Sequence, residues 1–439
     1  MAGWGASVLG PSVLRLRATS ADMVATAEHH RNPPPVGPWT FEDPHSGGLT
    51  DHFLLRDCST MGVPLASPRA RSARARILDL SRERRADAAY LRELSTNLRA
   101  VVPFDGAFLA AADPLTALAT SPARVESLHD VPDLCRIWWE SEFLVEDFMR
   151  FGDLALAPRP TATLAQATDG RPARSPRYRA VHNALGFADE LRVVFRTGSV
   201  AWGVASLWRR EDESQFSPAE ERVLADLSEA MAQPFRRAAL PQEPEPQPGV
   251  DGPGLLVFDR SGRFESLNEQ AEMWLAELPQ PVVTGRRGDF LPTELLAVSA
   301  RARAISAGVA HGSAQARVQT LAGRWLVIHG FALRTAEGVP DRTALVIQPA
   351  RASEVVPLIV GAYELTRREQ QITQLISYGL STGEIAHRLG LSPHTVRDYL
   401  KQVFEKVGVS SRGELVARIF AGHYGPRLDA SILESATGD

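Results

Sequence analysis

The sequence LTRREQQITQLISYGLSTGEIAHRLGLSPHTVRDYLKQVFEKVGVSSRGELVARIF, residues 365–420, determines the fold of the C-terminal part of the chain. It contains S/T-x-x-E capping boxes, in which a hydroxyl accepts from a first-turn N–H while the glutamate accepts from the cap N–H. The three pairs are Thr366 with Glu369, Ser381 with Glu384, and Ser411 with Glu414. Ser392 followed by Pro393 marks a further helix start. The sequence therefore predicts four short helices, and the tight turn Gly390-Leu391 is typical of a helix-turn-helix.

The third of these helices, residues 393–407, has one apolar stripe and one polar face. The stripe has the period of a helix that packs on a core and consists of Val396, Leu400, Val403, Phe404 and Val407. The polar side chains of the first two turns are His394, Thr395, Arg397, Asp398 and Lys401. In a helix-turn-helix this part of the second helix meets base edges in the major groove, where arginine binds guanine O6 and N7. We therefore expect Arg397 and Lys401 to contact DNA; the alternative is a solvated helix face.

The whole segment resembles the LuxR/NarL-type (GerE-like) DNA-binding domain, whose pattern is LT-x-RE, G-x-SN-x-EIA-x-x-L, S-x-x-TV-K/R and KLGV-x-x-R. The matching residues are Leu365-Thr366, Arg368-Glu369, Gly379, Ser381, Glu384-Ile385-Ala386, Leu389, Ser392, Thr395-Val396-Arg397, Lys406-Val407-Gly408-Val409 and Arg412. The resemblance implies that Arg397 and Lys401 enter the major groove, that Thr395 and the start of helix two hold phosphates, and that the fourth helix supports dimerisation. The DNA interface predicted in this way consists of Thr366, Ser381, Thr382, Ser392, His394, Thr395, Arg397, Asp398, Lys401, Lys406 and Arg412.

Two departures from the family pattern affect target choice. Thr382-Gly383 replaces the usual Asn-Lys pair and removes a phosphate contact. Asp398 occupies a position that is often Val or Ala in the family, and Tyr399 one that is often His. The operator preference of relatives therefore does not transfer to this chain. Region 4 of sigma factors shares the central pattern. The capped fourth helix and the lack of a recognisable promoter-melting region argue against that alternative.

Composition limits the class of protein. The chain of 439 residues has a net charge of −4, whereas residues 363–420 hold eight basic and six acidic side chains, a net charge of +2. So weak a positive charge indicates modest DNA affinity for one subunit, and we expect a homodimer. The two cysteines, Cys58 and Cys135, are typical of a reduced cytoplasmic protein. No apolar run is long enough to span a bilayer, and arginines interrupt the apolar N-terminus, so neither a membrane segment nor a signal peptide is expected.

The N-terminal half is expected to begin with a disordered segment, residues 1–69, which contains the run NPPPVGP. Residues 70–100 predict one long helix, either a coiled-coil helix or a helix packed on a sheet. Strands near 104–118, a helical middle at 131–151, a hairpin at 191–209 and a closing helix capped by Ser217 and Glu220 follow. This order resembles a GAF domain, which we assign to residues 70–238.

Large aromatic side chains in this GAF-like module are candidate ligand contacts. They are Trp138, Trp139, Phe143 and Trp202. Domains of the GAF type often bind a small molecule between sheet and helices, so the resemblance implies a pocket there. The alternative is an ordinary hydrophobic core, in which such residues are common.

A Pro- and Glu-rich linker at 239–252 precedes a second module. Residues 253–352 read strand, turn, strand, a helix opened by Asn268, further helix, and two alternating strands near 324–350. This order resembles a PAS domain.

The helix-turn-helix domain is assigned to residues 358–424 and a flexible tail to 425–439. The expected fold class is therefore multidomain α+β: a GAF-like α/β sensor, a PAS-like α+β module and a C-terminal all-α four-helix helix-turn-helix.

The sequence favours a regulator over an enzyme. No phosphate-binding loop, H-E-x-x-H, G-x-S-x-G or Cys/His ligand spacing is present, so we expect no catalytic residue, metal or cofactor. The predicted function is a one-component transcription regulator whose GAF/PAS-like modules bind a small-molecule effector or partner protein and control binding to double-stranded DNA, with RNA polymerase as a possible partner. The alternative is a constitutive DNA-binding protein whose N-terminal modules only mediate dimerisation or other protein contacts.

Overall fold

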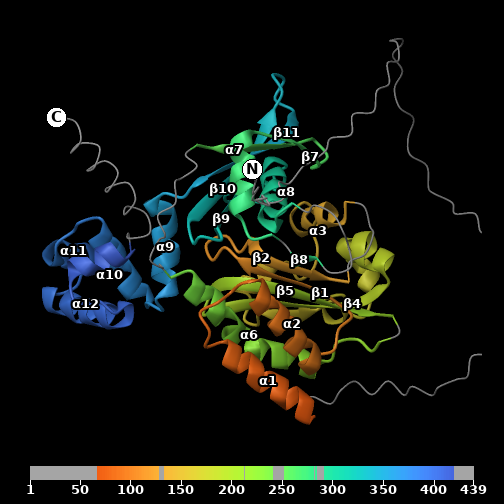
Figure 1. Ribbon diagram of the computed structural model, residues 1–439, viewed down its shortest axis with the longest axis horizontal. Coiled ribbons are helices and arrows are strands. Elements are labelled where there is room, and N and C mark those ends of the chain that lie inside the picture. The colour runs from red at the N-terminus through yellow and green to blue at the C-terminus, as the bar shows by residue number, and fades with distance from the viewer. Residues whose placement is uncertain are drawn as a thin grey trace, which may run out of the picture. The chain divides into compact units, whose positions relative to one another are not determined.

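The computed structural model describes residues 67–127, 133–211, 213–240, 252–280, 282–283 and 291–419. Nearly all of the expected disordered segment 1–69, most of the linker 239–252 and the whole tail 425–439 lie outside the described residues. The described residues form three consecutive modules, each with its own hydrophobic core, and a helix that joins the second module to the third (Figure 1).

The first module is built on an antiparallel sheet with the strand order β3-β4-β5-β1-β2, to which β8 adds in parallel. Its strands are β1 (Gly106–Ala112), β2 (Ala119–Glu126), β3 (Thr161–Thr163), β4 (Phe187–Thr197) and β5 (Val200–Arg210). Its α-helices are α1 (Pro68–Leu80), α2 (Ala88–Val101), α3 (Leu134–Phe143), α4 (Phe151–Leu156), α5 (Leu164–Ala167) and α6 (Pro218–Ala238). The short turns η1 (Pro172–Arg174), η2 (Tyr178–His182) and η3 (Asn183–Leu185) precede β4.

Helices cover both faces of this sheet. Figure 1 shows α2 and α6 against one face with α1 outside them, where Leu191, Val193 and Phe195 of β4 join the core. The other face packs against α3, α4 and the η segments. The alternation along β4 explains the two layers, because successive side chains of a strand point to opposite faces. Helix α6 begins at the predicted capping box, in which Glu220 N donates to Ser217 Oγ.

The prediction of one long helix at 70–100 is wrong. Two helices, α1 and α2, form a hairpin in its place. Ser81 ends α1, and Asp87 starts α2 by accepting at Oδ1 from Tyr90 N at 2.8 Å. The polar residues that interrupt the apolar seam, Arg84 and Asp87, lie in this connection. An aspartate at an N-cap position stabilises a new helix start, and folding back lets both apolar faces reach one core.

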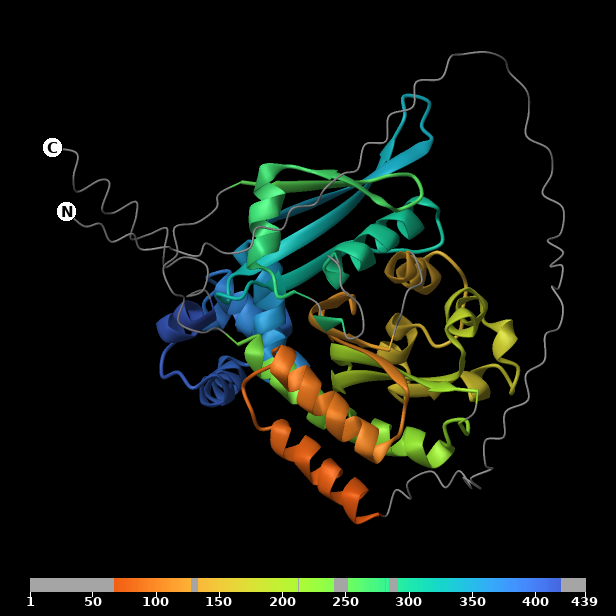
Figure 2. The ribbon, with the colours of Figure 1, turned by 45° about the vertical axis from the view of Figure 1, so that its right-hand side comes forward.

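The second module contains a five-stranded antiparallel sheet with the order β7-β6-β11-β10-β9. Its strands are β6 (Gly254–Phe258), β7 (Phe264–Leu267), β9 (Gln315–Gln319), β10 (Trp325–Arg334) and β11 (Pro340–Pro349). Its helices are α7 (Glu269–Glu277), capped by Asn268 as predicted, and α8 (Thr293–Ser306). The predicted final strand pair is confirmed. Figure 2 shows the end of this β10–β11 hairpin extending beyond the other strands.

Helix α8 lies between the two modules and is buried on two sides. Leu295 and Val298 belong to the core of the second module, whereas Ala297 and Ala300 pack into the core of the first. A glycine on β10, Gly330, permits the close approach, since a Cβ there would lie 2.8 Å from Val298 Cγ1. The chain also crosses between the modules at β8 (Val282–Val283), which pairs with β2 of the first module.

The third module is helical. It contains α10 (Arg367–Ser377), α11 (Thr382–Leu389), α12 (Pro393–Val407) and a last helix at 412–419, which confirms the four predicted helices. Helix α9 (Ala352–Ala362) precedes them and was not predicted. Among the described residues no helix is long and apolar enough to cross a bilayer.

Candidate nucleic-acid interface

The helix starts of the third module follow the predicted capping pattern. Thr366 Oγ1 accepts from Glu369 N at 3.3 Å, and Glu369 Oε2 accepts from Thr366 N at 2.7 Å. Ser381 and Glu384 make the same reciprocal pair at 3.3 and 2.7 Å. These bonds satisfy first-turn N–H groups that would otherwise lack a partner, so each short helix has a defined first residue.

The cap of the last helix differs in one bond. Ser411 Oγ accepts from Glu414 N at 3.1 Å as predicted, but the Glu414 carboxylate accepts from Ser410 N at 2.8 Å, not from the N–H of Ser411. The carboxylate therefore reaches one residue further back than in a standard capping box.

Helix α12 is oriented by its apolar stripe. Val396, Leu400, Val403 and Val407 are buried in the core of the module, and Phe404 is partly buried against it. The turn before α12 is closed by Gly390 with φ of 64°, a backbone conformation that glycine adopts readily. Ser392 Oγ then accepts from Thr395 N at 3.0 Å and Pro393 occupies the first helical position. This arrangement exposes the face opposite the stripe.

Arg397 and Lys401 stand on that exposed face, one helical turn apart. Neither makes a hydrogen bond or ion pair with another of the described residues. His394 Nδ1 and Asp398 Oδ2 lie 3.0 Å apart beside them, both largely exposed. The first two turns of α12 therefore present two unpaired cations next to a histidine–aspartate pair, all accessible to a ligand as large as duplex DNA.

The remaining predicted contacts lie at the helix starts or face inward. Thr366, Ser381 and Ser392 accept from backbone N–H groups as N-caps, and Thr382 is the first residue of α11. A hydroxyl that accepts in this way still has its own proton, and the first-turn N–H groups lie beside it. The DNA contacts of these residues stay predictions.

Lys406 and Arg412 have partners inside the module. Lys406 Nζ lies 2.7 Å from Glu369 Oε2, and the Glu369 side chain is only 1% exposed. Burial works to raise the pKa of Glu369, but the bonds from Lys406 and Thr366 hold that pKa below its ordinary value. Arg412 Nη2 donates to the carbonyl of Leu380. Lys406 thus fastens α12 to α10, and Arg412 fastens the last helix to the turn between α10 and α11. Contact with DNA by either is a prediction.

One arginine that brings the first two helices of the domain together was matched to the family pattern but given no role from the sequence. Arg368 Nη2 donates to Leu389 O at 2.8 Å, so α10 holds the carbonyl end of α11. The pattern LT-x-RE contains this arginine. Its spacing alone does not distinguish a structural contact from a phosphate contact.

The predicted ligand contacts of the first module lie on different faces of its sheet. Trp138 and Trp139 are buried in the core beside α3, with Phe143 partly buried against it. Trp202 is buried on the opposite face, in the core beneath α6. The structure therefore brings three of these residues together and separates the fourth, and a ligand among them stays a prediction.

Helix α9 shows a connection that the sequence reasoning missed. It contributes Leu358 and Ala362 to the core of the first module, Val355 and Ile359 to a cluster on β10, and Val356 to the helix-turn-helix core. An internal proline, Pro357, together with apolar residues on every side, gave no periodic signal for this helix. Helix α9 is apolar on every side because it packs against three different clusters.

Comparison with known proteins agrees with the geometry of the third module. Residues 363–419 match the family model described as bacterial regulatory proteins, luxR family. This segment is a luxR-family helix-turn-helix domain. The Escherichia coli transcriptional regulatory protein UhpA is 45% identical over 58 residues, which is 13% of this chain and 30% of that protein. DesR of Bacillus subtilis is 39% identical over 57 residues, 13% of this chain and 29% of that protein.

The chain therefore spans about 30% of the length of the first curated relatives it matches. Among solved structures, a Vibrio cholera VqmA complex with ligand and DNA is 21% identical, covering 40% of this chain and 84% of that one, with a TM-score of 0.19. So low a score provides no support for any arrangement of domains or ligands.

Proposed function

We propose that this protein is a transcription regulator that binds operator DNA through its luxR-family domain and is controlled by its two N-terminal α+β modules. The observation on which the proposal rests is the exposed first half of α12. There Arg397 and Lys401 extend from a helix whose opposite face is fixed in the core. A capped second helix with free cations on its first turns has the geometry of a recognition helix in the major groove.

The sensory role rests on the form of the first two modules. Counting strands within each module, and setting β8 aside, both sheets follow the order second, first, fifth, fourth, third. Each sheet has helices on at least one face. This shared topology supports the GAF-like and PAS-like assignments. The alternative, a constitutive DNA binder, would use the same modules only for protein contacts.

We also propose an oligomeric state, a cellular location and partners for the protein. The luxR-family domain has a net charge of only +2, so we propose that a homodimer supplies useful DNA affinity. The protein is proposed to act in the cytoplasm, with RNA polymerase as a possible partner at the promoter, and to catalyse no reaction. It binds a small molecule or partner protein as effector and uses no cofactor.

Removing the positive charge of either Arg397 or Lys401 should weaken operator binding. We expect Arg397→Ala and Lys401→Ala each to reduce affinity by about 1–3 kcal/mol, because each removes a base or phosphate contact from the major groove. Operator fragments are first selected from random DNA with the wild-type chain. Affinity for the selected fragment is then measured by fluorescence anisotropy, with unrelated DNA as a reference.

The matched control is Arg222→Ala, which removes one exposed arginine from α6 in the first module. It should leave operator affinity unchanged. If Arg397→Ala and Lys401→Ala bind the operator as tightly as the control, the assignment of α12 as recognition helix is wrong. A wild-type chain whose operator affinity responds to no metabolite or partner would favour the constitutive alternative.

A further inference from the structure

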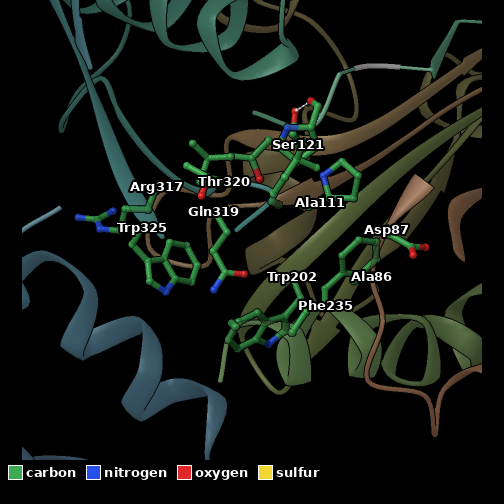
Figure 3. Close-up of a pocket in the computed structure, with 18 of the residues that line it drawn as sticks. Ala86, Asp87, Ala111, Ser121, Trp202, Phe235, Arg317, Gln319, Thr320 and Trp325 are labelled. Atoms are coloured by element: carbon green, nitrogen blue, oxygen red, sulfur yellow. Dashed lines mark hydrogen bonds between the residues drawn. The ribbon is translucent and has the colours of Figure 1, made fainter. Parts of the chain in front are cut away.

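A cavity of about 480 Å³ opens where the first and second modules meet. The α1–α2 connection contributes Arg84 and Asp87, β9 contributes Gln319, and α9 contributes Leu358. Figure 3 shows side chains from both modules directed at the same space. The volume lies within the range of sites that bind small molecules, roughly 300–1,000 Å³. The cavity is therefore large enough for a molecule of one or two rings.

Three aromatic side chains of the described part of the chain line the cavity. Trp202 and Phe235 are buried in the first module, and Trp325 of the second module is half-buried. The indole of Trp202 is held by a bond from Nε1 to Thr197 Oγ1 at 2.9 Å, so the ring has a fixed position where it lines the cavity. Aromatic walls of this kind favour a flat, apolar partner, which they contact edge-on or by offset stacking.

The amide of Gln319 bridges the two modules at this wall. In the orientation that satisfies both of its ends, it donates to Ala238 O and accepts from Trp325 Nε1, each at 3.2 Å. Ala238 ends α6 of the first module, and Trp325 begins β10 of the second. The two indoles that line the cavity are therefore both fixed by hydrogen bonds, and a ligand need not order them.

Of the three arginines that line the cavity, Arg84 alone has no acidic partner among the described residues. Arg85 binds Glu93 at 2.6 Å and Glu83 at 3.0 Å, and Arg317 binds Asp113 at 2.9 Å. Arg84 is exposed and makes no hydrogen bond or ion pair with the described part of the chain. A planar guanidinium binds a carboxylate through two parallel bonds, so Arg84 is suited to an acidic ligand group.

The cavity is in direct contact with the helix that leads to the luxR-family domain. Arg317 Nη1 binds Asp113 of the first module, while its Nε donates to Glu354 O of α9 at 2.5 Å. At the other end of α9, Arg236 of the first module donates to Ala362 O at 2.5 Å and lies 2.6 Å from Glu364 just beyond the helix. Leu358 of the same helix lines the cavity. An occupant that moves these groups also moves α9, which shares the core of the DNA-binding module.

We propose that this cavity binds a small aromatic carboxylic acid, with its ring between Trp202 and Trp325 and its carboxylate on Arg84, and that binding shifts α9 and so changes operator affinity. The regulatory half rests on the proposed function, whereas the binding half does not. Coupling between such sites is typically a factor of about 5–150 in affinity, which sets the size of effect to look for.

The test uses the full chain and the probe 2-naphthoate, with neutral 2-naphthamide as its isostere, both titrated by isothermal calorimetry. We expect 2-naphthoate to bind at least tenfold more tightly, since Arg84 makes a charge-assisted bond with the carboxylate and only a weaker one with the neutral amide. Arg84→Gln should abolish that preference, and Ala111→Phe, which fills the cavity, should abolish binding of both. The control Arg82→Gln removes a neighbouring exposed arginine that does not line the cavity and should behave as wild type.

Equal binding of acid and amide by wild type, or an unchanged preference in Arg84→Gln, would overturn the assigned chemistry. Absence of binding would overturn the site. Operator affinity is measured in the same samples with and without 2-naphthoate, and a change of fivefold or more is expected. An unchanged operator affinity despite bound probe would overturn the regulatory half. A chain that binds 2-naphthoate but no DNA would instead contradict the proposed function, so the two failures are distinguishable.

Discussion

Replacing Glu190 with Gln is expected to lower the free energy of unfolding of the first module by about 3–5 kcal/mol, the usual loss when one partner of a buried ion pair is removed. Glu190 lies on β4 and is fully buried. Its Oε1 accepts from Arg192 Nε at 2.6 Å, and its Oε2 lies 3.3 Å from Arg177 Nη2. The substitution would leave two buried guanidinium groups short of a counter-charge.

The surrounding network explains why the loss should be large. Arg192 Nη1 also donates to Glu142 Oε2 at 2.6 Å, and Arg177 Nη1 lies 3.6 Å from Asp147 Oδ2. All of these side chains are nearly inaccessible to solvent. Burial works to raise the pKa of Glu190, but Arg192 and Arg177 outweigh it and hold that pKa far below its ordinary value. The carboxylate is therefore charged, and its partners depend on it.

The measurement is the urea midpoint of wild type and variant, followed by tryptophan fluorescence. Trp138 and Trp208 lie in the same core and report on it. The control is Arg342→Met, which removes one partner of the exposed Arg342–Glu265 pair in the second module. That pair faces solvent, so its loss should be much smaller. Equal losses for both variants would show that the buried network does not stabilise the module.

Local signals predicted the elements but not this network. Caps, turns and periodic apolar residues fix a helix start or a strand from a few neighbouring residues, which is why the Thr366 and Ser217 caps were confirmed. The ion network joins residues 50 positions apart, such as Glu142 and Arg192. Each charge alone resembles an ordinary surface residue, because only the folded sheet brings them together.

The candidate sites could be predicted from the sequence only where they depend on neighbouring residues. The exposed and buried faces of α12 could be read from one helix, since both depend on its own period. The interdomain cavity depends on contacts between modules, so only Trp202 among the predicted ligand residues lines it. Helix α9 was missed for a related reason. Its composition reflects three different neighbours, and no single period describes it.

Acid titration should separate two buried groups whose effects on stability have opposite signs. Burial lowers the pKa of His182 from 6.5 to about 4, with Glu190 and Asp147 opposing and Arg177 and Arg192 adding to the shift. Burial raises the pKa of Glu294 on α8 from 4.5 to about 7. His182 is thus an uncharged base at neutral pH. Glu294 keeps its proton up to a pH at which most carboxyl groups are ionised.

The geometry around Glu294 fits a protonated acid. Ser121 Oγ lies 3.0 Å from Glu294 Oε2 and 2.9 Å from Pro279 O, yet a hydroxyl has only one proton to donate. If Glu294 donates its proton to Ser121 Oγ, the serine is free to donate to Pro279 O. Both bonds are then satisfied. Glutamine at this position can donate in the same way at every pH, which makes Glu294→Gln a model of the protonated form.

The signs follow from which state binds more protons. Between pH 6.5 and 4 the unfolded chain protonates His182 while the folded chain does not, so stability is lost as pH falls. Between pH 4.5 and 7 the folded chain keeps the Glu294 proton while the unfolded chain loses it, so stability is lost as pH rises. Each of these two differences between the folded and the unfolded pKa corresponds to about 3 kcal/mol of stability.

Urea midpoints at intervals from pH 4.5 to 7.5 test this. Relative to wild type, Glu294→Gln should become more stable as pH rises, by up to about 3 kcal/mol near neutrality. Relative to wild type, His182→Gln should become more stable as pH falls toward 4.5. Other titrating groups cancel in these differences, because they are present in all three proteins. Two flat curves would mean that these groups are ionised in the folded protein much as they are in water, and two curves with the same sign of slope would mean that one of the two pKa values shifts in the opposite direction.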